Sequence, residues 1–352
     1  HAQPQLQADM LALADLLHSL GADLDAVDGQ GLSPLYGAIG RGNNMVLGQW
    51  LLDHGANPND GDTLYHATEL GHHAGLRMLL AAGARPEGTN ALFRAMDFHD
   101  HQAVALLIAH QSSALGIDSH AVGGSDAMAI HALHHAARRG CDARMVEMLL
   151  EGGADPMRRY QGAYPYAFAR VYGNKALATA LTARGATVDL SREEALMVRA
   201  AEGAASPGEY IDPGKLPAAY RMILPDVMLL PGRLSQMQRL VALGLPYDAP
   251  DGQGVTPLQL AGWQGLPEVM TFFIKLRADL SHINGHGGTL LTTILHGAEN
   301  CPDRAGRDHQ GCLELALKAG VALPCHVIRQ IGRSDLRAFL ADWAAAHPGQ
   351  VV

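Results

Sequence analysis

One short pattern returns along this chain at a nearly constant interval, and it limits the folds that the chain can adopt. Residues 28–59 (DGQGLSPLYGAIGRGNNMVLGQWLLDHGANPN) contain the full pattern: a turn, a short helix, a bend at Gly42, a longer helix and a stop at Gly55. Ser33 and Pro34 begin the first helix, because a hydroxyl group caps free backbone N–H groups and proline suits the first helical position. Two helices this short cannot bury their apolar faces alone, so each unit needs neighbours of the same kind.

Copies of the unit are marked by an apolar residue near the start of each first helix: Leu35, Leu64, Leu92, Leu133, Tyr166, Leu196, Leu258 and Leu290. Successive markers lie 29, 28, 41, 33, 30, 62 and 32 residues apart. Most of these spacings are near ~33 residues, the length of a turn plus two helices. The pattern therefore predicts an all-α stack of about nine helix-turn-helix units.

The repeated unit resembles the ankyrin repeat, whose pattern is roughly G-x-T-P-L-H-x-A-A-x-x-G-H, then a second helix ending in L-L, then G-A-D. Residues 254–265 (GVTPLQLAGWQG) and 132–155 (ALHHAARRGC…MLLEGGAD) follow it closely. The resemblance extends from about Leu11 to Trp343. It implies an ankyrin-repeat solenoid, a right-handed stack whose concave groove binds another protein.

The repeats are predicted to form one array over residues 1–346, followed by a tail at 347–352. Regular repeats are expected at 28–110, 128–203 and 233–300. The ends are expected to be closed by a partial repeat at 1–27 and by a capping helix pair at 312–346, with Phe339, Leu340 and Trp343 on its inner face. Three segments interrupt the period: an enlarged loop at 111–127, an irregular insertion at 204–232 and a loop insertion at 301–311.

The second half of the irregular insertion is predicted to hold a degraded first helix near residues 222–230, with its second helix at 235–244. Long insertions in repeat arrays collect on loops and often carry function.

Composition excludes some partners. The net charge of −9, from 26 basic and 35 acidic residues, argues against a general nucleic-acid binder, which needs clustered Lys and Arg. No apolar run approaches the ~20 residues that span a bilayer, so no membrane insertion is expected. The opening HAQPQLQ is typical of a mature exported protein, which predicts a periplasmic or secreted location. An artificial start point is the alternative explanation, and it leaves a cytoplasmic location open.

The cysteines suggest one cross-link. Cys301 and Cys312 flank a polar segment without helical pattern, and in an oxidising compartment they are candidates for a disulfide. Cys141 follows Gly140 within a repeat and is expected to be a small free thiol. No CxxC pair occurs, which argues against a zinc ribbon or a thioredoxin-like centre.

The 19 histidines invite a metal hypothesis, but the sequence contains no HExxH. The family places histidines where the imidazole bridges backbone groups of neighbouring repeats, and His72 and His134 match those positions. We therefore predict a structural role for them, and neither a metal nor a cofactor.

No catalytic residues are predicted either. The chain has no GxSxG elbow, no phosphate-binding loop and no GxGxxG after a strand. The acidic pair Glu193-Glu194 is expected at the solvated surface, because adjacent helical residues point to different faces.

The predicted site is a protein-binding surface. In the family, the two residues before each bend point into the groove; here they are Gly40-Arg41, Glu69-Leu70, Asp97-Phe98, Arg138-Arg139, Val171-Tyr172, Trp263-Gln264 and Leu295-His296. Helix periodicity favours polar residues there, yet Phe98, Tyr172 and Trp263 are large aromatics, a residue type that dominates interface energetics. Tyr160 and Tyr164 lie on the turn side of a second aromatic concentration. The predicted partner-binding residues are Arg41, Leu70, Phe98, Arg138, Arg139, Tyr160, Tyr164, Tyr172, Trp263, Gln264 and His296.

Two readings of the aromatic residues stay open: they bind a partner, or the insertions cover them and they belong to the core. The predicted function is non-catalytic binding of another protein by a chain that is monomeric when free. One version is an immunity protein or inhibitor that occludes a toxin enzyme. The alternatives are an enzyme or small-molecule binder with a pocket formed by residues 204–232, and a host-directed bacterial effector.

Overall fold

The computed structural model describes residues 4–111, 130–204, 207–302 and 304–352. Regular secondary structure in these ranges is helical, and β-pairing is limited there to isolated bridges such as the one between Tyr160 and Ala163. The predicted all-α class is therefore confirmed. None of the helices in the same ranges is long and apolar enough to cross a bilayer.

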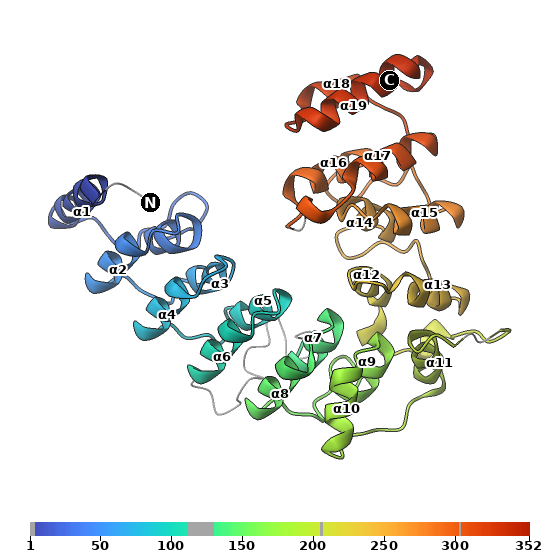
Figure 1. Cartoon of the computed structure of the whole chain (residues 1–352), viewed down its shortest axis with the longest axis horizontal. Coiled ribbons are helices and arrows are strands. Elements are labelled where there is room, and N and C mark those ends of the chain that lie inside the picture. The colour runs from blue at the N-terminus through green and yellow to red at the C-terminus, as the bar shows by residue number, and fades with distance from the viewer. Residues whose placement is uncertain (1–3, 112–129, 205–206, 303) are drawn as a thin grey trace. The chain divides into compact units, whose positions relative to one another are not determined.

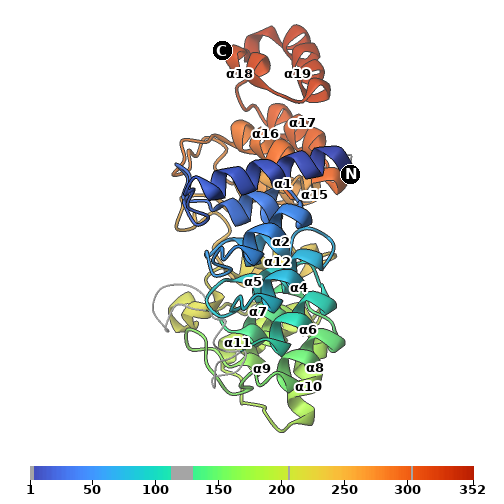
Figure 2. The ribbon, with the colours of Figure 1, turned by 90° about the vertical axis from the view of Figure 1, so that its left-hand side faces the viewer.

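The chain divides into two compact units. Unit 1 comprises the described residues up to Ser191, together with residues 217–219. Its helices are α1 (Pro4–Ser19), η1 (Tyr36–Arg41), α2 (Met45–Asp53), α3 (Thr63–Ala67), α4 (Ala74–Ala81), α5 (Ala91–Asp97), α6 (His101–Ala109), α7 (Ala132–Arg139), α8 (Ala143–Glu151), α9 (Pro165–Tyr172) and α10 (Lys175–Ala183). The first helices of successive repeats (α3, α5, α7 and α9) form one row, and the second helices (α4, α6, α8 and α10) form another (Figures 1 and 2).

Unit 2 comprises residues 192–216 and 220–352, as far as they are described. Its helices are α11 (Arg192–Ala201), η3 (Pro213–Lys215), α12 (Ile223–Met228), α13 (Leu234–Ala242), α14 (Pro257–Trp263), α15 (Pro267–Lys275), α16 (Leu290–Asn300), η5 (Arg304–Gly306), α17 (His309–Lys318), α18 (Cys325–Gln330), α19 (Ser334–Ala346) and η6 (Pro348–Gln350). The short helix η4 (Ala218–Tyr220) contains residues of both units. The predicted degraded first helix and its second helix are confirmed as α12 and α13.

Local sequence signals begin the helices and turn the chain between them. The Ser33 hydroxyl accepts a hydrogen bond of 2.9 Å from the Tyr36 amide, as its capping role requires. At the bend between the two helices of a repeat, Gly71, Gly140, Gly173 and Gly265 all have positive φ. In the third repeat His99 takes the same position with a φ of 52°, a conformation that is unfavourable for a side chain with a Cβ.

Buried polar side chains connect consecutive repeats. The His134 imidazole Nε2 lies 3.1 Å from the Ala163 carbonyl of the next repeat, which confirms the predicted bridging role. The Asn174 side chain donates to the carbonyls of Ala136 and Cys141 at 3.0 and 3.1 Å, and it also caps α10. His72 also links two repeats, but through a side chain of the neighbouring repeat: its Nε2 contacts Asn43 Oδ1 at 2.7 Å, and its Nδ1 accepts from the Ala74 amide at 3.3 Å.

The three irregular segments differ in what the structure contains. Residues 112–127 of the enlarged loop lie outside the described residues. The insertion at 204–232 contains η3, η4 and α12, and it is fastened to α13 by a hydrogen bond from the Ile211 amide to the Leu243 carbonyl at 2.9 Å. The loop at 301–311 contains η5 and ends early, since α17 begins at His309.

The C-terminal segment packs back onto the preceding helices. In the predicted cap, Leu340 is fully buried, whereas Phe339 and Trp343 are half-buried. The Gln350 side chain donates to the carbonyls of Leu317 and Val321, both at 2.7 Å, and accepts from the Trp343 indole at 3.0 Å. The residues predicted as a tail therefore tie α19 to the end of α17.

Two predictions about side chains in unit 2 are corrected. Glu193 and Glu194 are buried instead of solvated, because α11 packs against α13 and the buried Tyr220 hydroxyl donates to Glu194 at 2.9 Å. The disulfide between Cys301 and Cys312 is absent. Cys312 is a buried free thiol whose pKa burial raises to about 12, and the Cys301 thiol donates to the Gln264 side-chain oxygen at 3.5 Å. Cys141, by contrast, is the buried free thiol that was predicted.

Candidate protein-binding surface

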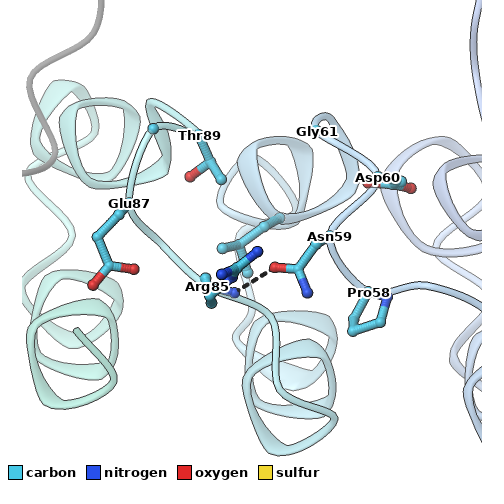
Figure 3. Close-up of a pocket in the computed structure, with 9 residues that line it drawn as sticks. Pro58, Asn59, Asp60, Gly61, Arg85, Glu87 and Thr89 are labelled. Atoms are coloured by element: carbon cyan, nitrogen blue, oxygen red, sulfur yellow. Dashed lines mark hydrogen bonds between the residues drawn. The ribbon is translucent and has the colours of Figure 1, made fainter. Parts of the chain in front are cut away.

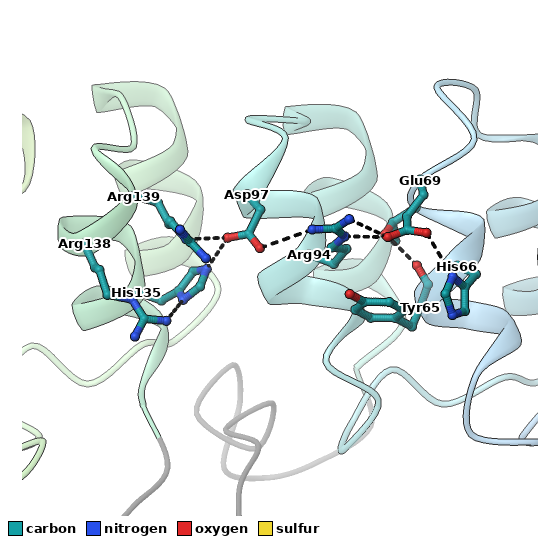
Figure 4. A network of polar contacts seen from close by, with 9 residues as sticks. Tyr65, His66, Glu69, Arg94, Asp97, His135, Arg138 and Arg139 are labelled. Atoms are coloured by element: carbon teal, nitrogen blue, oxygen red, sulfur yellow. Dashed lines mark hydrogen bonds and ion pairs between the residues drawn. The ribbon is translucent and has the colours of Figure 1, made fainter. Parts of the chain in front are cut away.

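A row of charged side chains crosses three consecutive repeats of unit 1. It uses two register positions on the first helices, two and five residues after the apolar markers Leu64, Leu92 and Leu133, and Arg139 joins them from the next position along α7. Residues three apart on a helix share one face, so both positions point to the same side of each repeat. Figure 4 shows these side chains in contact from one repeat to the next. We call the set the charge ladder, which comprises His66, Glu69, Arg94, Asp97, His135, Arg138 and Arg139.

The first half of the charge ladder centres on Arg94. Its Nε donates to Glu69 Oε1 at 2.7 Å, across the boundary between two repeats. The other oxygen of Glu69 lies 2.9 Å from His66 Nδ1. Arg94 also faces Asp97 one turn along α5, with 3.8 Å between Nη1 and Oδ2. A guanidinium group held from two sides has little freedom left to lose on binding.

The second half of the charge ladder centres on Asp97. His135 Nε2 and Arg139 Nε, both from the next repeat, lie 2.8 and 2.7 Å from Asp97 Oδ1. Burial alone would raise the pKa of Asp97, but the hydrogen bond from His135 and the charges of Arg139 and Arg94 outweigh it and lower the pKa below its usual value. Asp97 is therefore ionised at neutral pH.

His135 links Asp97 to Arg138. The ring is almost fully buried, stacks on Phe93 with 4.8 Å between centroids, and has a pKa lowered by burial. Arg138 Nη2 lies 3.2 Å from His135 Nδ1. Since arginine can only donate, Nδ1 is the acceptor and the ring proton resides on Nε2, directed at Asp97.

Phe98 is the exposed apolar residue beside the charge ladder. Its side chain remains 46% exposed, and the Arg94 guanidinium lies over the ring at 4.6 Å from the centroid. Arg94 also lies 5.7 Å from the ring of Tyr65, whose pKa is raised by burial. Aromatic residues and arginine are both enriched in protein interfaces.

The structure brings together three of the predicted site residues, namely Phe98, Arg138 and Arg139. Leu70 is half-buried and Arg41 is exposed, each on a neighbouring repeat of unit 1. The prediction for Tyr172 is wrong: its side chain is fully buried and stacks on Phe168 with 4.2 Å between ring centroids, so it belongs to the core.

The two other tyrosines of unit 1 lie near the turn before α9. Tyr164 is half-buried, and Arg159 both stacks on its ring at 4.2 Å and donates to its hydroxyl at 2.6 Å. Tyr160 is half-buried against His134, with 5.5 Å between ring centroids. Their role as binding residues stays a prediction.

The remaining predicted residues belong to unit 2. Trp263 is half-buried, and its backbone carbonyl lies 3.0 Å from His309 Nε2. Gln264 is also half-buried, while His296 is exposed and contacts Asn300 at 3.1 Å. Trp263 and Gln264 thus take part in packing between α14 and the segment that leads into α17.

Sequence reasoning placed four of the seven ladder residues in the groove, namely Glu69, Asp97, Arg138 and Arg139, and missed the other three. It selected arginines and aromatic residues before the bends, but not His66, Arg94 or His135, which come three residues earlier. The usable signal was the sign of charge at the two register positions: His66 then Glu69, Arg94 then Asp97, His135 then Arg138. In the first two pairs a basic residue precedes an acidic one, and in the third pair both residues are basic. This pattern predicts ionic contacts between repeats only when the register of one helix against the next is known.

One cavity of unit 1 is formed by the turns between repeats. A cavity of about 420 Å³ lies between the turns before α3 and α5, lined by Pro58, Asn59, Asp60, Gly61, Leu64, Arg85, Glu87, Gly88 and Thr89 (Figure 3). Its polar groups serve the turns: Asn59 Oδ1 accepts from the Arg85 amide at 2.8 Å, and Asp60 accepts from the Thr63 amide at 2.9 Å. No group of three or more His, Cys, Asp or Glu within the described ranges is arranged to hold a metal ion.

The pocket postulated at the irregular insertion is small. A cavity of about 170 Å³ is lined by Ala204, Pro207, Gly208, Glu209, Tyr210, Arg239, Ala242 and Leu243. Pockets for small molecules usually enclose about 300–1,000 Å³. This cavity therefore gives little support to the small-molecule alternative.

The repeated helix pairs define a helical repeat protein, and comparison with known families identifies the repeat. Residues 6–87 match the family model for three ankyrin repeats, and residues 130–160 match that for a single ankyrin repeat. Both matched segments are therefore ankyrin repeats, as the sequence resemblance predicted. Ankyrin repeats are generally protein–protein interaction modules, and proteins built from them are typically non-catalytic scaffolds.

Solved structures include similar chains. An ankyrin repeat domain from Acinetobacter baumannii is 26% identical over 51% of this chain and 94% of its own length, with a TM-score of 0.40. The human ASB11 ankyrin repeat domain is 19% identical over 81% of this chain and 98% of its own length, with a TM-score of 0.32. No curated protein matches the sequence.

Proposed function

We propose that the chain binds a partner protein through the charge ladder and Phe98 of unit 1. The observation that carries this proposal is the exposed Phe98 ring under a guanidinium group that Glu69 and Asp97 hold in place. Leaving an aromatic ring exposed gains nothing for folding. Fixing an arginine over that ring lowers the entropy that a partner must overcome on binding.

The proposal is tested by replacing Phe98 with alanine. An aromatic residue at the centre of an interface typically contributes ~2 kcal/mol or more, so F98A should weaken capture of the partner about 30-fold or more. Thermal stability should change little, because the side chain is 46% exposed. The assay is co-purification of the tagged chain from its native host, with the captured proteins quantified by mass spectrometry.

Tyr210 provides the matched control. Its side chain is 66% exposed, on the irregular insertion in unit 2. Y210A should capture the same partner as the wild-type chain. If F98A and Y210A captured equal amounts, Phe98 would have no role in binding and the proposal would be refuted.

At a finer level, we propose that the partner is an enzyme that the bound chain occludes, in the manner of an immunity protein or an inhibitor. The support is physical: a surface fixed by ionic contacts before binding suits a tight stoichiometric inhibitor. The captured enzyme should lose activity in a 1:1 mixture with the wild-type chain and keep it with F98A. Full activity in the 1:1 complex would contradict the inhibitor role and leave the binding surface intact.

Location stays a prediction. One candidate location is the periplasm or the exterior of the cell. The host-directed effector needs no disulfide and would act in the cytosol of its target. Fractionation of the native host, with the chain detected by antibody, separates the two.

A further inference from the structure

We infer that the partner presents an acidic side chain to Arg138, next to an apolar side chain that covers Phe98. This inference rests on the proposed function, since it specifies the chemistry of the partner that the charge ladder binds. It follows from an imbalance of charge within the ladder and from the bonding of Arg138 itself.

The charge ladder has more cations than anions. In the repeats of α3 and α5, the position five residues after the marker is acidic, Glu69 and Asp97. In the repeat of α7 the same position is Arg138, so the alternation of sign stops there. Two carboxylates thus face three guanidinium groups, those of Arg94, Arg138 and Arg139. This local surplus of positive charge occurs in a chain whose net charge is −9.

Neither carboxylate of the ladder is available to Arg138. Asp97 already contacts Arg139, His135 and Arg94, and Glu69 contacts Arg94 and His66. Arg138 instead contacts the neutral ring of His135, with 3.2 Å between Arg138 Nη2 and His135 Nδ1. Among the residues that the structure describes, Arg138 Nε, like Arg139 Nε, is buried without a hydrogen-bond partner, so a partner protein can reach only the outer nitrogens of the Arg138 guanidinium group. A guanidinium group in this position gains most from a carboxylate, which accepts two parallel hydrogen bonds.

His135 holds Arg138 in place without supplying a carboxylate. Its Nε2 proton is directed at Asp97, so its Nδ1 must be an acceptor and holds Arg138 in position. An imidazole acceptor orients the guanidinium group without neutralising it. The arginine is therefore positioned for a second partner while its charge stays uncompensated within the ladder.

Phe98 lies close enough to Arg138 for one partner segment to contact both. The ring is on the repeat of α5, and α5 packs directly against α7, which carries Arg138. A partner segment that places an apolar side chain on the Phe98–Arg94 stack has only one repeat to cross before it reaches Arg138. A basic segment would meet the surplus positive charge and be repelled.

Peptide display tests the inference while the partner is still unidentified. A random 12-residue peptide library is selected on the immobilised wild-type full-length chain, and enriched peptides are measured against the wild type, R138M, R138K and F98A. Met keeps most of the apolar stem of Arg138 and removes the charge, whereas Lys keeps the charge. Circular dichroism confirms that each variant is folded.

The expected result is enrichment of Asp and Glu, with about tenfold or greater weakening on R138M and a smaller loss on R138K. Changing the acidic residue of a selected peptide to its amide should weaken binding to the wild type about tenfold and leave binding to R138M unchanged. That pattern assigns the acid to Arg138, because the two changes remove the same contact.

Other outcomes overturn the inference. Enriched peptides without acidic residues would contradict it, as would an amide effect of equal size on the wild type and on R138M, or a library that yields no binder. If such peptides still lost affinity on F98A, the proposed binding surface would stand and only the acidic partner would be wrong. If neither R138M nor F98A weakened the binding of any selected peptide, the proposed binding surface would be refuted as well.

Discussion

The buried His134 makes a sharp prediction about how stability depends on pH. The ring is fully buried between two repeats, and burial lowers the pKa of His134 to about 3. In the unfolded chain the pKa of a histidine is about 6.5. Between these values the unfolded state binds a proton that the folded state does not. The stabilising contribution is therefore complete above about pH 6.5 and is lost as the pH falls toward 3.

The size of the effect follows from the two pKa values. At pH 5 the unfolded histidine is almost entirely protonated while the folded one is neutral, which lowers the free energy of unfolding by RT ln(1 + 10^1.5), about 2 kcal/mol. At pH 7.5 the same expression gives a loss of roughly 0.1 kcal/mol or less. His134 alone should thus account for about 2 kcal/mol of the difference in stability between pH 7.5 and pH 5.

The assay compares the wild type with H134Q by urea denaturation at pH 7.5 and pH 5. Glutamine keeps a donor for the Ala163 carbonyl and does not titrate, so its effect on stability at pH 7.5 cancels when pH dependences are compared. Other groups contribute equally to both proteins. H134Q should lose about 2 kcal/mol less than the wild type on acidification. Equal losses, or an NMR titration of His134 in the folded protein with a midpoint near 6.5, would refute the reasoning.

Three further predictions concern single positions. H99G should raise the free energy of unfolding by up to about 1 kcal/mol in urea denaturation, because His99 has a φ of 52° at a bend where other repeats have glycine. G71A puts a Cβ at the equivalent bend and should lower the free energy of unfolding. If H99G lowered it as well, contacts of the His99 side chain would outweigh the backbone strain, and the prediction would be wrong. D142A should cost about 1 kcal/mol, since Asp142 caps α8 through the Met145 amide at 2.8 Å and contacts His101 Nε2 at 2.9 Å. These contacts lower the pKa of Asp142, the hydrogen bond with His101 foremost, so its contribution should be lost as the pH falls below about 4, whereas a loss at higher pH would contradict the assignment. The mass of the intact protein should be unchanged by reductant, and a gain of two hydrogens would mean that Cys312 is in a disulfide after all.

Much of the fold could be predicted because its signals are local. The Ser33 cap, the bend glycines and the apolar markers each act within one helix or turn, and the ~33-residue period then implies stacking of the units. The bridging role of His134 was also predictable, because the position of the residue within the repeat determines which backbone group of the next repeat it meets.

The errors concern burial. Tyr172 sits where other repeats expose a side chain, but Phe168 one turn earlier stacks on it, so the ring is buried. Glu194 is buried because Tyr220, 26 residues along the chain, supplies a hydrogen-bond donor. The charge ladder depends likewise on contacts between repeats, such as Arg94 with Glu69. These contacts require the register of one helix against another, which periodicity alone does not provide.

The central claim, that the charge ladder and Phe98 form the partner-binding surface, is tested most directly by site-specific photocrosslinking. A benzophenone amino acid is placed at Phe98, or for comparison at Gln102, an exposed residue on α6 of the same repeat. The full-length chain is then irradiated in its native host. The account predicts one prominent crosslinked protein from position 98 and none from position 102. No crosslink at position 98, or the same protein at both positions, would contradict it.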